Sequence, residues 1–343
     1  MIEKSPSQDQ LKELYDLAFK FEQIKCWEYM EDTDIFGVMN PENGEIGYIC
    51  ILGNAGEVFG INIYRGARGL DGYLKVLSGE VYEGNNLFSL QYCLSLTFEV
   101  GDYLEKKDIA AIYESGISWV NKNMLPIFRS YIPGYYPWYL TEEEAKFFII
   151  CLQQTIDVCK RFKSNRGLFS TKKQNSYFIR ISASKGEKII WEDSFLKAVP
   201  YIEEAKPIVI NELKVQKITK KLFNRGGIWQ IGCAFFPLCI NDKKSRPYMP
   251  LNFLCVNGIT GEIVGSNMSD LRSYNLFIGE EILNLIEKCK KVPETIIVNN
   301  KDFIIGLQPL MKKLGITIKY KKIMGFYEEA ENALIDHINN RRS

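Results

Sequence analysis

Residues 126–141 read PIFRSYIPGYYPWYLT and lead directly into the strongest helix signal of the chain. Pro126, Pro133 and Pro137 each fix their own φ and push the preceding residue toward extended geometry. The stretch therefore cannot form one helix or a regular central strand. Pro133-Gly134 predicts a turn, because proline supplies a φ of about −65° and glycine tolerates a positive φ. We expect a stiff, irregular loop.

Aromatic residues and one arginine are concentrated in this predicted loop. A ring with a polar tip buries a large area and suits a contact surface, and Arg129 is a natural partner for an anion or an aromatic ring. The alternative is that the loop packs on its own domain, with its tyrosine hydroxyl groups bonded to the backbone. The candidate binding residues of the loop are Arg129, Tyr135, Tyr136 and Trp138.

The residues that follow predict a long core helix. Thr141 can cap its start while Glu144 reaches back, which is the capping-box pattern. The acidic residues at 142–144 also favour the positive end of the helix dipole. Apolar residues then recur at helical spacing, at Ala145, Phe148, Leu152, Ile156 and Cys159.

Length and composition are typical of a globular protein with two domains. A chain of 343 residues most often forms two domains, and an apolar content of 46% is enough for sizeable cores. The segment MIEKSPSQDQ at 1–10 lacks the apolar run of a signal peptide. The longest apolar runs, 147–152 and 233–240, are too short to cross a bilayer. We therefore expect a cytoplasmic protein that does not contact a membrane.

Cysteine and histidine usage argues against a metal centre. The 9 cysteines include no CxxC pair and mostly lie in apolar runs, as reduced, buried thiols do. His337 is the only histidine, so sites with several histidine ligands are excluded, and a Ser-His-Asp or Cys-His mechanism would have to use this residue. The sequence predicts no metal and no cofactor, and it favours a protein that is not an enzyme.

Charge is distributed unevenly along a chain whose net charge is only +1. Residues 1–163 hold 15 Lys and Arg against 24 Asp and Glu, whereas residues 164–343 hold 28 against 18. Either two domains of opposite charge attract each other, or the basic half contacts a polyanion such as nucleic acid. A solvated strand edge is the alternative for its basic and aromatic cluster, which is Lys217, Lys220, Lys221, Phe223, Arg225 and Trp229.

The pattern along the chain predicts an α+β protein. Strands at 46–52 and 58–64, with FGVM before them, predict an antiparallel meander with helices in an acidic domain over 1–163. The polar and basic segment 164–175 is the best candidate for a linker. Over 176–343 the order β-β-α-β-α-β-α predicts a basic domain with one mixed sheet and helices on its faces. Further strands are expected at 117–120 and 207–217.

Distinctive motifs are spread over both halves of the chain. The first half contains WEYMEDTDIFGV from Trp27, NPENGEIGY from Asn40, GNAGEVFGINIYRG from Gly53 and FRSYIPGYYPW from Phe128. The second half contains RPYMP from Arg246, GITG from Gly258 and PETIIV from Pro293. Together they resemble an uncharacterised bacterial family that joins such an N-terminal domain to a second domain of unknown function. The resemblance implies a two-domain protein and no activity, and its motif residues include Trp27, Arg65, Arg129 and Trp138.

The order of elements over 176–343 also resembles a degenerate ribonuclease H-like unit. Such nucleases need carboxylates at strand ends to hold divalent metal ions. Asn257 and Asn299 stand where an aspartate is expected, and an amide holds Mg²⁺ far less well than a carboxylate. Asp270 and Asp302 remain as substitutes for a catalytic site.

Two hypotheses for the function follow from these residues. The first is a non-catalytic binding or adaptor protein with an unidentified ligand, with another protein or a polyanion as its partner and with its oligomeric state open. Its candidate binding residues are Trp27, Arg65, Arg129, Tyr135, Tyr136, Trp138 and Arg246. The second is a phosphodiesterase or nuclease that depends on a divalent metal and uses Asp270 and Asp302.

Overall fold

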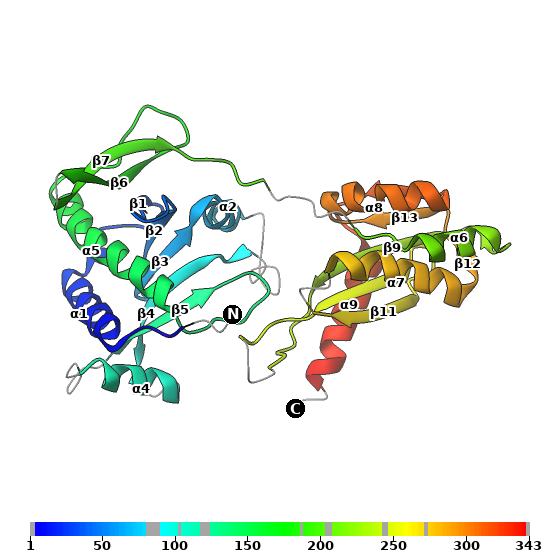
Figure 1. Ribbon diagram of the computed structural model, residues 1–343, viewed down its shortest axis with the longest axis horizontal. Helices are drawn as coiled ribbons and strands as arrows, with labels where there is room; N and C mark the ends of the chain where they lie inside the picture. The colour runs from blue at the N-terminus through cyan, green and yellow to red at the C-terminus, as the bar shows by residue number, and fades with distance from the viewer. Residues whose placement is uncertain are drawn as a thin grey trace. The chain divides into compact units, whose positions relative to one another are not determined.

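The computed structural model describes residues 4–79, 90–101, 104–116, 124–185, 188–202, 208–241, 246–270 and 274–340 (Figure 1). The strand expected at 117–120 lies outside these residues. The chain divides into two compact units, Met1–Tyr201 and Ile202–Ser343.

The first unit is built on a seven-stranded sheet with the order β5-β4-β3-β2-β1-β6-β7. Its strands are β1 (Phe36–Met39), β2 (Ile46–Leu52), β3 (Gly60–Arg65), β4 (Cys93–Val100), β5 (Met124–Tyr131), β6 (Ser176–Lys185) and β7 (Lys188–Lys197). Neighbouring strands are antiparallel except for β1 and β6, which run parallel. The expected antiparallel meander is confirmed by β1, β2 and β3.

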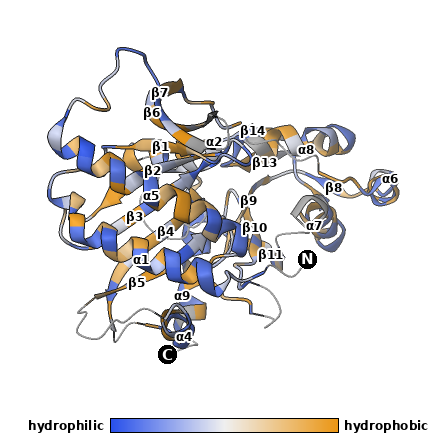
Figure 2. Cartoon of the chain, turned by 60° about the vertical axis from the view of Figure 1, so that its left-hand side comes forward, coloured by the Kyte–Doolittle hydropathy of each residue, from blue (hydrophilic) through white to orange (hydrophobic). Residues whose placement is uncertain are grey.

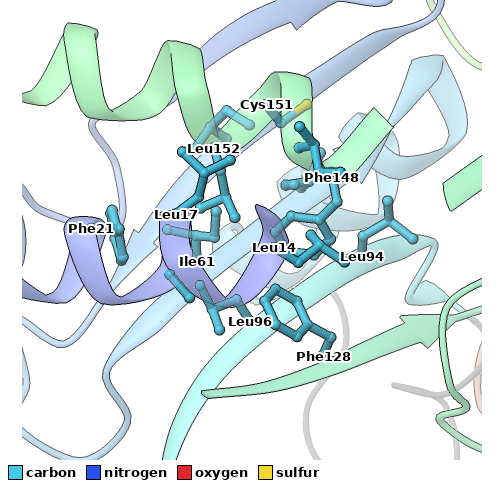
Figure 3. Packing of buried hydrophobic residues seen from close by; sticks show 14 of the residues in the cluster. Leu14, Leu17, Phe21, Ile61, Leu94, Leu96, Phe128, Phe148, Cys151 and Leu152 are labelled. Atoms are coloured by element: carbon cyan, nitrogen blue, oxygen red, sulfur yellow. The ribbon is translucent and has the colours of Figure 1, made fainter. Parts of the chain in front are cut away.

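Two helices, α1 (Gln8–Ile24) and α5 (Glu142–Ser164), share the main core of this unit with the sheet (Figure 1). Figure 3 shows their side chains converging on Ile61 and Leu96 of the strands. Figure 2 shows hydrophobic and hydrophilic residues interleaved along both helices, as expected for helices that bury one face. The buried helix residues include Leu14, Leu17, Phe21, Phe148, Cys151 and Leu152.

Three shorter helices belong to the described part of the first unit. In α2 (Gly66–Leu77), Leu70 and Tyr73 pack with Tyr48 and Cys50 in a separate, smaller core. The 3-10 helix η1 (Cys26–Glu28) and the helix α4 (Lys106–Glu114) join the main core, where Ile112 of α4 is buried. Helix α4 therefore packs beside α1, which matters for the site described below.

The predicted capping box at the start of α5 is confirmed. The Thr141 hydroxyl accepts the Glu144 N–H at 3.2 Å, and the Glu144 carboxylate accepts the Thr141 N–H at 3.0 Å. The second oxygen of this carboxylate accepts the Ser130 hydroxyl at 2.7 Å and lies 3.3 Å from a guanidinium nitrogen of Arg65. Glu144 therefore ties the start of α5 to β5 and to the end of β3.

The first part of the stretch 126–141 is a strand. The expectation of an irregular loop throughout is wrong for residues 126–131, which lie in β5. Pro126 is tolerated because β5 stands at the edge of the sheet, where one side of a strand has no neighbour to receive its N–H groups. The prediction that the stretch is neither a helix nor a central strand is confirmed.

The turn that follows β5 sends the chain back along it. The Tyr135 N–H donates to the Ile132 carbonyl at 3.0 Å, and Gly134 has a φ of 84°, so the predicted turn is confirmed. Ser130 and Trp138 then exchange backbone hydrogen bonds of 2.7 and 3.0 Å. Trp138 is thereby held beside β5, immediately before α5 begins.

The expected linker, 164–175, lies inside the first unit. It connects α5 to β6, and β6 pairs with β1 through Ile179 and Arg180. Phe178 is buried in the core that α1 and α5 form. The chain divides at 201/202 instead. A polar segment with a glycine suits any exposed connection, so its composition does not distinguish a loop within a unit from a linker between units.

The second unit contains a five-stranded mixed sheet with the order β11-β10-β9-β13-β14. Its strands are β9 (Ile228–Phe235), β10 (Leu251–Asn257), β11 (Ile263–Ser269), β13 (Thr295–Val298) and β14 (Thr317–Tyr320), and a short ladder joins β8 (Asn224–Arg225) to β12 (Lys291–Val292). Strands β9, β10 and β11 are antiparallel neighbours, whereas β13 runs parallel to β9 and β14. The α+β class is confirmed, and the element order agrees with a ribonuclease H-like arrangement.

Helices cover this second sheet through two separate cores. Helices α6 (Glu212–Lys220), α7 (Tyr274–Cys289) and α8 (Lys301–Leu314) share one core, and α9 (Gly325–Asn340) packs in the other. The strand expected at 207–217 is wrong for the described part of this range, because residues 208–211 form no strand and α6 begins at Glu212. The Asn211 side chain accepts the Lys214 N–H at 3.1 Å and caps this helix, and Val215 and Ile218 are buried three residues apart.

We expect a fragment of residues 1–201 to fold alone and a fragment of residues 1–163 not to fold. The shorter fragment lacks β6 and β7, which removes Phe178 from the core and exposes the apolar edge of β1. The free energy of unfolding of a domain is only about 5–15 kcal/mol, so the loss of two strands and of a buried phenylalanine should be enough to unfold the shorter fragment. Thermal unfolding followed by circular dichroism checks the prediction. A cooperative transition of both fragments at the same temperature would contradict it.

Candidate functional site

A pocket of about 310 Å³ opens in the first unit where three segments meet. They are the start of α1, one face of α4 and the segment 138–141 that returns from the turn. Small-molecule sites usually occupy roughly 300–1,000 Å³, so the pocket is large enough for a compact ligand. Its walls are mostly apolar and include Leu11, Leu14, Ala110, Ala111, Phe128 and Leu140.

A lysine held by two aromatic rings lies at this pocket. The Lys107 ammonium is 5.0 Å from the ring centre of Trp138 and 4.9 Å from that of Tyr139, which is the range of a cation–π interaction. The Tyr139 hydroxyl donates to a Glu105 carboxylate oxygen, which fixes the second ring. No ion pair joins Lys107 to a carboxylate of the described residues. Its charge is therefore positioned but not neutralised.

A buried ion pair supports the floor of the pocket. Two guanidinium nitrogens of Arg129 donate to the two carboxylate oxygens of Asp108 at 2.6 and 2.7 Å. Asp108 also accepts the Glu105 N–H at 3.1 Å, so it caps α4. Burial opposes the charge of Arg129, but the hydrogen bonds and charge of Asp108 outweigh burial and raise the pKa of Arg129. The pair fastens α4 to β5.

Tyr15 of α1 contributes a hydroxyl group to the wall of the pocket. The residue lines the pocket, is only 3% exposed, and its ring meets Phe128 edge-on at 5.4 Å between centres. Its hydroxyl makes no hydrogen bond within the described part of the chain. Burial and then the charge of Asp108 raise the pKa of Tyr15, so the hydroxyl keeps its proton. It is a hydrogen-bond donor without an acceptor.

Trp27 does not belong to this pocket. Its ring lies 5.2 Å from Phe59, 5.8 Å from Phe21 and 6.2 Å from Phe98, measured between ring centres. These contacts place Trp27, the middle residue of η1, against the main core. The structure therefore gives Trp27 a packing role in the core.

Arg65 is occupied by contacts within the first unit. Its guanidinium nitrogens lie 3.3 Å from carboxylate oxygens of both Glu45 and Glu144, and the group stands 5.1 Å from the ring centre of Tyr92. Arg65 Nε is buried and has no partner among the described residues. Because Glu144 caps α5, this arginine supports the segment that carries Trp138.

Among the predicted binding residues, Trp138 lines the pocket. Arg129 does not line it but forms an ion pair with Asp108, which does. Tyr135 and Tyr136 are half-buried in the turn region and are not among the lining residues of the described chain, and Arg246 lies in the second unit. Sequence reasoning predicted no site role for the other polar lining residues, which are Lys4, Ser5, Tyr15, Lys107, Asp108, Glu114, Tyr139 and Thr141.

The two units correspond to two known sequence families. Residues 12–180 match the family described as Domain of unknown function (DUF7309), and residues 214–335 match Domain of unknown function (DUF6930). The chain joins a DUF7309 domain to a DUF6930 domain. The expected pairing of two domains of unknown function is confirmed. The DUF7309 match continues to Arg180, so it includes the start of β6, in agreement with the sheet.

Further comparisons add little to this assignment. A comparison with curated proteins found no match. Among solved structures, the chain is similar to the catalytic core domain of BIV integrase, with 15% identity and a TM-score of 0.25, over 34% of this chain and 71% of that one. No described helix is both long and apolar enough to span a membrane.

The candidate catalytic aspartates of the DUF6930 domain are far apart along the sheet. Asp270 follows β11, and Asp302 lies in the first turn of α8, just after β13. Strands β10 and β9 stand between β11 and β13, so three strand spacings, or roughly 14 Å, separate their ends. Two catalytic metal ions lie about 3.5–4 Å apart. The described residues contain no group of three His, Cys, Asp or Glu that could hold a metal ion.

Other polar residues of this domain have structural partners. The Asn257 side chain accepts the N–H groups of Ile259 and Thr260 at 3.0 and 3.3 Å, so it stabilises the turn after β10. Within α9, the Tyr327 hydroxyl donates to Glu331 at 3.1 Å, and burial raises the pKa of this carboxyl group. Asn257 and Glu331 therefore already have hydrogen-bond partners within this domain.

The basic cluster of the DUF6930 domain is also largely paired. Lys217 and Lys221 lie 3.1 and 3.8 Å from the Glu287 carboxylate of α7. Arg225 donates to the carbonyl groups of Leu314 and Gly315 at 2.8 and 3.2 Å, which closes the end of α8. The geometry therefore favours a packing role over a continuous face for nucleic acid.

Replacing Arg129 with methionine should lower the free energy of unfolding by about 3–5 kcal/mol, because Asp108 is left buried without its partner. The double variant Arg129→Met/Asp108→Leu should recover part of this loss. Urea unfolding of the two single variants and the double variant measures the coupling. Lys146→Met, which removes exposed ion pairs with Glu142 and Glu143, should leave the free energy of unfolding almost unchanged. Equal costs for Arg129→Met and Lys146→Met would contradict the buried pair.

Proposed function

We propose that the protein is a non-catalytic binding protein whose DUF7309 domain holds a ligand in the pocket between α1, α4 and residues 138–141. The observation that carries the proposal is the composition of the pocket. Apolar walls surround a few fixed polar groups, and Lys107 is positioned on two aromatic rings. Pockets that bind small molecules combine an apolar lining with a small number of oriented polar groups in this way.

The chemistry of the pocket supports binding rather than turnover. General acid–base catalysis needs a group that can give or take a proton near neutral pH. Asp108 is engaged by Arg129 and by the start of α4, and the raised pKa of Tyr15 keeps that hydroxyl protonated. His337, the only histidine of the chain, belongs to α9 in the second unit. A cytoplasmic location and a protein or polyanion partner for the basic half stay predictions.

Filling the pocket should abolish binding. Ala110 is exposed on α4 and lines the pocket, so Ala110→Trp adds a large side chain without disturbing the core. A ligand present at 100 times its dissociation constant stabilises a protein by about 2.7 kcal/mol, which raises the melting temperature by roughly 5–10 °C for a protein of moderate size. We expect a thermal-shift screen of small amphipathic compounds to find such shifts for the wild type and to lose them in Ala110→Trp.

The matched control for this screen is Lys106→Trp. Lys106 lies on the same helix, is exposed and is not a lining residue. The control variant should respond to the same compounds as the wild type. Equal shifts in all three proteins would place binding elsewhere, and native mass spectrometry would report a ligand retained through purification.

The alternative function is a nuclease or phosphodiesterase in the DUF6930 domain that depends on a divalent metal. The strand order of this domain favours it, whereas the positions of Asp270 and Asp302 do not. An assay with single-stranded and double-stranded nucleic acid in Mg²⁺ or Mn²⁺ separates the two functions. Cleavage by the wild type that disappears in Asp270→Asn and Asp302→Asn would overturn the non-catalytic proposal.

A further inference from the structure

Two polar groups of the DUF7309 pocket are available to a ligand. The exposed Lys107 ammonium has ring contacts but no counter-ion among the described residues, and the Tyr15 hydroxyl makes no hydrogen bond there although it is not among the fully buried atoms that lack a partner. Both residues line the same pocket but come from different helices. A single ligand could therefore satisfy both groups at once.

The Tyr15 hydroxyl is a donor that a ligand in the pocket can use. The residue lines the pocket, and its hydroxyl is not among the fully buried side-chain atoms without a partner, so it is open to the pocket and not sealed in the core. The nearby carboxylate of Asp108 is held by both terminal nitrogens of Arg129 and by the Glu105 N–H. An oxygen atom of a ligand in the pocket would complete the bonding of this hydroxyl.

The exposed Lys107 ammonium can pair with an anion in the pocket. Trp138 and Tyr139 fix its position, and their rings leave its N–H groups able to meet an anion. Such an interaction would lie beside apolar walls, where a charge-assisted hydrogen bond is stronger than in water.

The acidic groups near the pocket do not favour a cation instead. Asp108 is paired with Arg129, and Glu105 accepts the Tyr139 hydroxyl. Glu114 also lines the pocket, but it is exposed at the last residue of α4. The buried acidic charge is thus already balanced, while the charge of Lys107 is not.

We infer that the pocket binds an organic anion that carries one carboxylate or sulfonate group on a compact apolar body. This inference rests on the proposed binding function and specifies its ligand class. The acidic group of the ligand meets Lys107 and accepts the hydrogen bond of Tyr15, and the apolar body contacts Leu11, Leu14 and Ala111. A neutral molecule of the same shape binds more weakly, because it satisfies neither polar group.

Two fluorescent probes with the same kind of aromatic frame test this inference. 8-Anilinonaphthalene-1-sulfonate carries a sulfonate, and N-phenyl-1-naphthylamine is its neutral counterpart. The full chain is titrated with each probe as wild type, Lys107→Met, Tyr15→Phe and Lys106→Met. We expect the Kd of the anionic probe to rise about tenfold in Lys107→Met and about threefold or more in Tyr15→Phe. These losses are of the size expected for one charged and one neutral hydrogen bond.

The controls separate charge from shape. Lys106→Met removes a positive charge one residue away, from a side chain that is not among the lining residues, and should leave both affinities unchanged. The neutral probe should bind all four proteins with similar affinity. Lys107 is exposed, so its replacement should not impair folding. Circular dichroism of each variant checks that it is folded.

The outcomes distinguish the inference from the proposed function. If both probes bind the wild type and both are lost in Ala110→Trp, but Lys107→Met and Tyr15→Phe bind the anion normally, the inference fails and the binding function stands. If Ala110→Trp binds both probes as the wild type does, the proposed site itself fails. Absence of binding of the anionic probe to the wild type also overturns the inference.

Discussion

The carboxylate of Glu144 is the contact on which the arrangement of the first unit depends. It caps α5 through Thr141, accepts the hydroxyl of Ser130 in β5 and pairs with Arg65 at the end of β3. Two consecutive elements, β5 and α5, thus meet the more distant β3 at one buried acid. Because Thr141 and Ser130 flank the return segment, the same carboxylate determines where Trp138 and Tyr139 stand, and hence one wall of the pocket. Support for the site comes from a residue that does not touch it.

Local signals in the sequence predicted much of this unit. The capping box, the turn at Pro133-Gly134 and the antiparallel strands depend on residues that are close in the chain, so their patterns are visible without a structure. The place of β6 was not predictable in this way. Its pairing with β1 joins residues that are more than a hundred positions apart, and nothing in a short window reports such a partner. For that reason the segment 164–175, which connects α5 to β6 within the first unit, was wrongly predicted to be the linker between the domains.

The site was predicted only in part for the same reason. Trp138 and Arg129 stood out because aromatic and charged residues are concentrated around them. Tyr15 and Lys107 lie in ordinary amphipathic helices, and only the packing of α1 against α4 brings them to one pocket. In the second unit the element order was predictable, whereas a function was not, because a fold accommodates many different sites. Asn257 and Glu331 show how its polar residues serve turns and helix contacts.

The parallel alignment of β1 with β6 has a consequence for how the molecule is made. A ribosome delivers the chain from its first residue onward, so one long side of β1 must wait, without a neighbour, until nearly two hundred residues have emerged. Contacts that close such a large loop form slowly, and an unsatisfied strand edge is a surface on which nascent chains stick to one another. The first unit is therefore expected to complete its sheet late in translation and to benefit from chaperones that shield that side of the strand.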